Sequence, residues 1–161
     1  MYKRQVGNGA FELVRRGTGG GAVGVTPVID NSSGSTVVTL DLSGSFTTAA
    51  GLVDGNYQLT VRGDLITSSS GVAIDGDGDG NAGGDLVFGD TAADNFFRLF
   101  GDNDGNRSVN VFDLLAFRST FGDSNGDANF NAQFDSNADG NVNVFDLLAF
   151  RDNFLETLVF V

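Results

Sequence analysis

The chain has 161 residues, of which 40% are hydrophobic and 15 are phenylalanine, so it can bury the core of one ordinary domain or two small ones. Its formal net charge is -12 at pH 7, and it contains neither cysteine nor histidine. This composition excludes disulfides and thiol chemistry. It also argues against nucleic acid or anionic lipid as a partner, because like charges repel.

The negative charge lies entirely in the second half of the chain. Residues 1–74 carry five acidic and five basic side chains, whereas residues 75–161 carry 16 acidic side chains against four arginines, which accounts for the whole -12. The second half also holds 13 of the 15 phenylalanines. These shifts predict a division into residues 1–74, an acidic glycine-rich linker over 75–90, and a second folded unit over 91–161.

The start of the chain, MYKRQVGNGAF, lacks the apolar core of a secretory signal peptide. No stretch approaches the roughly 20 apolar residues of a membrane-spanning helix, so we expect no membrane insertion. We interpret the chain as the C-terminal part of a longer protein, in which residues 1–8 need not belong to the fold.

The first half is predicted to form short β-strands. Phe11–Arg16, Ser35–Gly44 and Asn56–Gly63 are rich in valine, leucine, threonine and tyrosine, and turns rich in glycine and serine separate them. Strands at this spacing indicate an antiparallel β-sandwich, although these are few for a complete one. No site chemistry is visible, so we interpret this half as a structural spacer.

The acidic linker begins like a cation-binding loop. Asp75, Asp77 and Asp79 alternate and are followed by Gly80, but Leu86 stands where a closing carboxylate is needed. Two interpretations stay open: a third calcium ion that stiffens the linker, or a flexible acidic connection.

The second unit contains a duplication. Val109–Arg118 is repeated, residue for residue, as Val142–Arg151, and each copy follows a run of alternating Asp and Asn. Calcium takes 6–8 oxygen ligands, and a twelve-position loop supplies them from positions 1, 3, 5, 7, 9 and 12, with glycine at 6. The spacing therefore predicts about two Ca²⁺ ions. The candidate ligands are Asp102, Asp104, Asn106, Ser108, Asn110 and Asp113 in the first loop, and Asp135, Asn137, Asp139, Asn141, Asn143 and Asp146 in the second.

The two loops differ at position 6, which is Gly140 in the second loop and Arg107 in the first. A non-glycine residue there needs a left-handed backbone that costs about 1 kcal/mol or more. We therefore expect the first loop to bind calcium more weakly. Val142 at position 8 is expected to pair the two loops through a short β-bridge.

Helices are predicted on both sides of the loops. The repeated FDLLAFR has an amphipathic pattern, with Leu114, Phe117 and Phe121 on one face, and Leu147, Phe150 and Phe154 repeat it. Entering helices are predicted at Thr91–Phe100 and around Asn129–Phe134. Helix–loop–helix pairs of this kind would make the second unit all-α.

This duplicated pattern, over about residues 96–155, resembles the dockerin type I repeat. The resemblance implies a calcium-dependent EF-hand-like pair at the C-terminus of a secreted bacterial protein, often a carbohydrate-active one, with a cohesin domain as partner, and it implies the same twelve ligands. The preceding residues 55–85 resemble the end of a bacterial Ig-like domain. The expected fold class is thus α+β by segregation, an Ig-like antiparallel β-sandwich followed by an all-α EF-hand/dockerin-like pair.

The partner surface is less well matched to that family. Its members carry Ser-Thr-type pairs before the last Asp of the loop, where this chain has Val111-Phe112 and Val144-Phe145. Exposed aromatic pairs on a near-symmetric module would form a partner surface. The alternative is that these residues belong to the core.

We expect a non-catalytic calcium-binding module, located outside the cell or on its surface, that mediates attachment to a protein partner. The alternative is a purely structural, calcium-stabilised tail of a large extracellular protein, for example a polysaccharide-degrading enzyme. An enzyme is not expected, because histidine and cysteine are absent and the paired carboxylates lie in the loops.

Overall fold

The computed structural model describes residues 3–32 and 34–161, which form two compact units. The first, here called the β unit, comprises residues up to Phe46 together with Tyr57–Phe96. The second, the loop–helix unit, comprises Thr47–Asn56 and Phe97–Val161. Residues 47–56 thus group with the C-terminal part of the chain.

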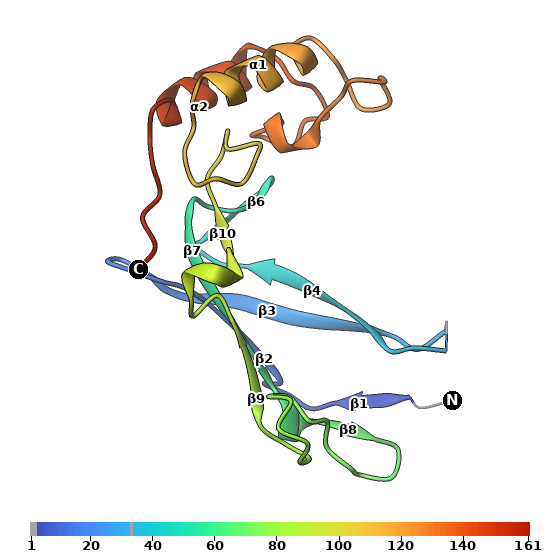
Figure 1. Cartoon of the computed structure of the whole chain (residues 1–161). Coiled ribbons are helices and arrows are strands. Elements are labelled where there is room, and N and C mark those ends of the chain that lie inside the picture. The colour runs from blue at the N-terminus through green and yellow to red at the C-terminus, as the bar shows by residue number, and fades with distance from the viewer. Residues whose placement is uncertain (1–2, 33) are drawn as a thin grey trace. The chain divides into compact units, whose positions relative to one another are not determined.

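The β unit is built on one antiparallel sheet with the strand order β9-β7-β2-β3-β4 (Figure 1). A separate ladder joins β1 to β8. The strands are β1 (Arg4–Val6), β2 (Phe11–Arg15), β3 (Gly21–Asp30), β4 (Val37–Ser43), β7 (Gly55–Arg62), β8 (Ile66–Ser68) and β9 (Asp85–Phe88), and two 3-10 turns, η1 (Gly63–Leu65) and η2 (Ala92–Asp94), complete the unit.

Side-chain alternation explains these strands. Exposed and half-buried residues alternate along all of β4, as expected for a strand with one face toward solvent. Leu13 at the centre of the sheet pairs with Val23 on one side and Leu59 on the other. Leu13, Val23 and Tyr57 are buried, so the core of the β unit lies around β2.

The prediction of an Ig-like β-sandwich is wrong. In the β unit, β9, β7, β2, β3 and β4 lie in one curved sheet, and the other sheets of the described residues have only two strands each. The prediction located three strand segments correctly: β2 and β4 fall within the predicted ranges, and β7 begins one residue before its range. Alternation predicts a strand with one buried face, but it does not predict what covers that face.

The loop–helix unit contains two α-helices, α1 (Val111–Thr120) and α2 (Val144–Asn153), and a 3-10 turn, η3 (Ala132–Phe134). It also contains a hairpin of β5 (Thr47–Thr48) and β6 (Gly51–Leu52), and β10 (Phe97–Arg98), which pairs with the first two residues of β7. Neither helix has the length and apolar character needed to cross a bilayer, and no other helix in residues 3–32 and 34–161 does. Its core consists of Phe100, Val109, Phe117, Phe134, Val142 and Phe150.

The two helices meet through their phenylalanines. The rings of Phe117 and Phe150 lie 5.1 Å apart, and that of Phe134 stands edge-on to Phe117 at 5.3 Å. This confirms the predicted central Phe of each amphipathic stripe. The stripe is narrower than predicted, because Phe121 and Leu147 remain exposed.

The prediction of an all-α second unit is wrong. In place of an entering helix over Thr91–Phe100, the chain forms η2, turns at Asn95 with a left-handed φ of 53°, and then enters β10. The second predicted entering helix is only the three-residue η3. The chain is therefore predominantly β, and each repeat is a loop followed by a helix, without the first helix of an EF-hand.

Candidate metal centre

The first loop, residues 102–113, is organised by the carboxylates at its start. Asp102 Oδ2 accepts the N–H of Arg107 at 2.8 Å, and Asp102 Oδ1 accepts that of Asn106 at 3.2 Å. Asp104 accepts both the backbone and side-chain N–H of Asn106, at 3.1 and 2.9 Å. These bonds turn the backbone tightly. Carboxylate oxygens of Asp102, Asp104 and Asp113 consequently lie within 4.8 Å of one another.

The closing carboxylate of the first loop is buried. Asp113 accepts the N–H of Asn103 through Oδ1 and that of Asn110 through Oδ2, both at 2.8 Å. It therefore ties the second and ninth loop positions together and also completes the N-terminal capping box of α1. Each oxygen accepts a single N–H, which leaves acceptor capacity on both for a hard cation.

The second loop, residues 135–146, repeats this scaffold with Asn137 and Asp139 at positions 3 and 5, where the first loop has Asp104 and Asn106. Asp135 accepts the N–H of Asp139 at 3.1 Å and that of Gly140 at 2.8 Å. Asn137 bonds to Asp139 through both its side-chain oxygen and its side-chain nitrogen, each at 3.0 Å. Among the described residues, groups of three mutually close carboxylates occur in the first loop and at residues 75–79, but not in the second loop.

Asp146 closes the second loop and is fully buried. Its Oδ2 accepts the N–H of Asn143, and its Oδ1 accepts two donors, the backbone N–H and the hydroxyl of Ser136, all at 2.8 Å. The Ser136 hydroxyl thus uses a lone pair of Asp146 Oδ1. The corresponding lone pair on Asp113 remains available to a cation. The spacing argument missed Ser136 because it considered only the alternate positions of the loop.

The residues predicted at positions 7 and 9 have structural roles of their own. Asn110 and Asn143 cap the helices, since their side-chain oxygens accept the N–H of the residue two places on. The Ser108 hydroxyl lies 3.0 Å from that of Thr157, and the Asn141 side chain accepts from Ser124 at 2.8 Å. At position 7, the backbone carbonyl is the atom expected to face an ion.

The backbone strain expected at Arg107 is present, with φ at 70°. The second loop, however, carries the same strain at position 4, where Ala138 has φ 57° and the first loop has Gly105 at 74°. Gly140 adopts φ 79° at position 6. Each loop thus has one glycine and one non-glycine residue in the left-handed region, and the strain argument no longer ranks their affinities.

The two loops do not pair with each other in the way predicted from Val142. The N–H of Val142 instead donates to Asp123, after α1, and the N–H of Val109 donates to Glu156, after α2, at 2.9 and 3.0 Å. Each loop therefore pairs with the segment that follows the helix of the other repeat. This interlocking depends on contacts that are distant in sequence, so no local pattern could predict it.

Electrostatics differ between the loops. Burial raises the pKa of the Asp102 carboxyl above its ordinary value, against the opposing effect of N–H donors led by that of Arg107. The pKa of Asp139 is lowered, first by the side-chain amide of Asn137 and then by that of Asn141. A cation beside Asp102 would offset the desolvation that raises its pKa.

The Val–Phe pairs, Val111-Phe112 and Val144-Phe145, are exposed at the start of each helix. Phe112 is 72% exposed and Phe145 is 65% exposed, and both valines are more than half exposed. The interpretation of these residues as core is therefore wrong. Each pair stands directly beside a buried loop-closing aspartate, Asp113 or Asp146.

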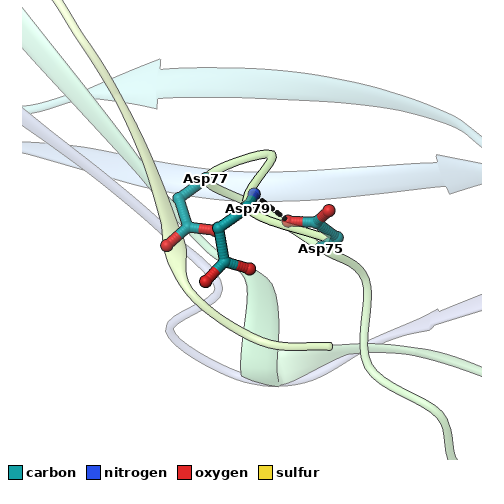
Figure 2. Close-up of side chains that lie close together, drawn as sticks. All are labelled: Asp75, Asp77 and Asp79. Carbon is teal, nitrogen blue, oxygen red and sulfur yellow. Dashed lines mark hydrogen bonds between the residues drawn. The ribbon is translucent and has the colours of Figure 1, made fainter. Parts of the chain in front are cut away.

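The third acidic group, Asp75, Asp77 and Asp79, gathers on an exposed turn of the β unit. Oxygens of the three carboxylates lie within 4.8 Å. Figure 2 shows the N–H of Asp79 donating to Asp75, at 3.1 Å. The turn is anchored by a bridge between Asp75 and Gly83. These bonds account for the arrangement without an ion, and a third calcium stays a prediction.

Comparison with known proteins does not show a family for this chain. No family model matches it. No curated protein matches it either. A solved structure, of a type II cohesin–X–dockerin complex from Acetivibrio cellulolyticus with a mutated N-terminal interface, matches at a TM-score of 0.31 and 19% identity, over 84% of this chain and 83% of that chain. A likeness this distant transfers neither fold nor partner.

The assignment to the dockerin type I family, with an Ig-like neighbour, is therefore wrong. The predominantly β fold and the lack of entering helices in the described residues oppose it. The loop spacing that prompted it specifies local turns and helix caps, which the structure contains. Local turns of this kind do not define the fold around them.

Proposed function

We propose that this chain is a non-catalytic calcium-binding module that attaches to a protein partner. Each loop binds one Ca²⁺ ion through the oxygen ligands predicted from its spacing, and the ion orders the loop–helix unit. The Val–Phe pairs form the partner surface.

The observation that carries the calcium proposal is the burial of one carboxylate at the end of each loop. Asp113 is 1% exposed and Asp146 0%, and burial of an uncompensated carboxylate destabilises a fold. Backbone N–H groups donate hydrogen bonds to both oxygens of each carboxylate, but they do not neutralise its charge. The ion pairs formed by the described residues include neither aspartate. A divalent cation held with the other carboxylates of the loop would supply the positive charge.

Calorimetric titration with Ca²⁺ tests this proposal. We expect about two sites in the full chain, and one site in each of the variants Asp113→Asn and Asp146→Asn. These substitutions keep the size of the side chain but remove its charge. The matched control is Asp152→Asn, an exposed carboxylate on α2 that pairs with Arg151, and it should leave both sites intact. Absence of binding heat in the full chain, or two sites remaining in both loop variants, would contradict the proposal.

The partner proposal rests on the duplicated, exposed Val–Phe pairs. Large apolar side chains presented together on a surface favour burial against another protein, and aromatic residues contribute most of the binding energy at such interfaces. The two pairs occupy equivalent positions on α1 and α2, so a partner can engage either one. We propose a folded protein domain as the partner class, and a cohesin-type domain is the candidate to be tested.

Binding to a cohesin-type domain is the corresponding test. Changing Val111 and Phe112 to Ser, together with Val144 and Phe145, should abolish binding and leave both calcium sites in place. Val72→Ser, which alters an exposed valine of the β unit, is the control and should bind normally. If the full chain binds calcium but no such domain, the alternative of a calcium-stabilised structural tail is favoured.

We also propose that the protein acts outside the cell. Loops with three carboxylates and several amide ligands suit weak sites such as those of extracellular modules, whose dissociation constants are about 10⁻⁴–10⁻³ M. A measured dissociation constant that is micromolar or weaker would agree with this location. Nanomolar affinity would contradict it, because such loops fill at cytosolic calcium levels.

A further inference from the structure

The C-terminal segment of the chain, Leu155–Val161, lies along the first loop, and we call it the C-terminal strap. The N–H of Leu158 donates to the Arg107 carbonyl at 2.8 Å. Ser108 and Thr157 form an antiparallel bridge, with their hydroxyl oxygens 3.0 Å apart. The strap therefore contacts Arg107 and the predicted calcium ligand Ser108.

Arg107 is the residue on which these contacts converge. Its N–H donates to Asp102 at 2.8 Å, and its guanidinium Nη1 donates to the side chain of Asn56 at 2.6 Å. The guanidinium carbon lies 4.2 Å from the ring centre of Phe97 and 5.8 Å from that of Phe160 in the strap. These distances are those of cation–π contacts. One residue thus joins a predicted calcium ligand, the strap and the strands beside them.

Asn56 also links Arg107 to the strap, because its side chain bonds to both. While its side-chain oxygen accepts from Arg107, its side-chain nitrogen donates to the Val159 carbonyl of the strap at 2.8 Å. Asn56 is itself 3% exposed. The guanidinium and the strap are therefore held by a common buried amide.

The second loop offers a direct contrast. Its position 6 is Gly140, whose carbonyl accepts the N–H of Asn125 at 2.7 Å, just as Arg107 accepts that of Leu158. The backbone pairing is thus the same in both loops, but Gly140 has no side chain to hold the paired segment. Glycine would also adopt the φ of Arg107 without strain. The arginine side chain, and not the backbone, is what distinguishes the first loop.

We infer that Arg107 is a positioning residue that couples calcium binding in the first loop to docking of the C-terminal strap. This inference rests on the proposed calcium function. Asp102 accepts the N–H of Arg107, Leu158 donates to the carbonyl of the same residue, and the Arg107 side chain contacts Asn56 and Phe160. Because all these contacts meet at Arg107, an ion that fixes Asp102 favours the docked strap. By thermodynamic reciprocity, the docked strap favours the ion by the same factor.

The test compares Arg107→Gly with Ala138→Gly in the full chain. Both substitutions relieve a left-handed non-glycine residue, but only the first removes the strap's anchor. First-loop affinity is measured in an Asp146→Asn background, and docking is measured as hydrogen exchange of the Leu158 amide. Arg107→Gly should weaken first-loop calcium binding by roughly fivefold or more and accelerate exchange, whereas Ala138→Gly should change neither. First-loop affinity that is unchanged or higher in Arg107→Gly, with unchanged exchange, would overturn the inference.

A second variant, Phe160→Ala, changes the strap and leaves every loop residue intact. It should shift affinity and exchange in the same direction as Arg107→Gly, which keeps the test decisive if that variant folds poorly. If the unaltered chain binds no calcium, the proposed function fails. The role of Arg107 as an anchor of the strap is then tested by hydrogen exchange in the absence of calcium. In that case Arg107→Gly should still accelerate exchange at Leu158, and an unchanged rate would refute the anchor.

Discussion

At the residue scale, the two repeats differ most where the backbone is left-handed. The pattern seen at loop positions 4 and 6 recurs after the helices, where Gly122 has φ 95° and its equivalent, Leu155, has φ 73°. Leu155 is also 76% exposed, so its side chain contributes little packing to offset the strain. The repeat sequences are identical over ten residues, but their strain is distributed differently.

Leu155→Gly is therefore expected to stabilise the loop–helix unit by about 0.5–1 kcal/mol, since glycine adopts this φ freely. The hydrogen bond from its N–H to Val109 is a backbone contact and is retained. Chemical denaturation would measure the change. Leu148→Gly, an exposed position inside α2, is the matched control and should instead destabilise by about 1 kcal/mol. Destabilisation by Leu155→Gly as well would show that its side chain matters more than its backbone.

Ser136 provides a second test at this scale. Its hydroxyl donates to Asp146 Oδ1, which also accepts the N–H of Ser136. Ser136→Ala should free acceptor capacity on that oxygen and tighten calcium binding in the second loop, as seen by calorimetry in an Asp113→Asn background. Ser119→Ala removes an exposed hydroxyl that bonds only within α1 and should change nothing. Weaker binding in Ser136→Ala would mean that the hydroxyl orients the carboxylate for the ion.

At the scale of elements, the sequence was informative about the loop–helix repeats and misleading about what precedes them. FDLLAFR lies within α1 and α2, and the capping boxes begin at Asn110 and Asn143 as the alternating Asp and Asn suggest. The predicted entering helix was replaced by β10, because Phe97 and Arg98 pair with residues some 40 positions earlier. Such long-range pairing overrides local helical propensity.

The exposure of the Val–Phe pairs could not be predicted from periodicity either. In α1, the buried positions are Asp113, Phe117 and Thr120, a stripe that contains one large apolar residue and two polar ones. A hydrophobicity pattern predicts that valine and phenylalanine are buried and that aspartate is exposed. In α1 the opposite holds: Asp113 is buried because it bonds to the loop backbone, and Phe112 consequently points to solvent.

At the scale of the whole molecule, six of the 16 acidic side chains of residues 75–161 lie in the two loops. The acidic side chains of residues 102–146 lie mostly in the two candidate calcium sites and their surroundings, where their mutual repulsion opposes folding in the absence of cations. The β unit has its own sheet and its own buried residues around Leu13 and Tyr57. We therefore expect the two units to respond differently to removal of calcium.

Thermal unfolding with calcium or with a chelator would measure that difference. Far-UV circular dichroism follows α1 and α2. The near-UV tyrosine band, recorded in a Tyr2→Phe variant whose remaining tyrosine is Tyr57, follows the β unit. Calcium at 100 times its dissociation constant should stabilise the loop–helix unit by about 2.7 kcal/mol per site. The tyrosine transition should move much less. Equal shifts of both transitions would indicate that calcium acts on the chain as a whole, and not through the loops.

The most direct measurement of the central claim is a calcium titration followed by amide NMR at Arg107 and Gly140. Each of these N–H groups donates at 2.8 Å to the carboxylate that opens its loop, Asp102 or Asp135. An ion bound to that carboxylate must change the N–H environment. We expect both amides to shift and to saturate, with Asp113→Asn abolishing the response at Arg107 alone and Asp146→Asn abolishing that at Gly140 alone. If neither amide shifts at millimolar calcium, the loops are not calcium sites.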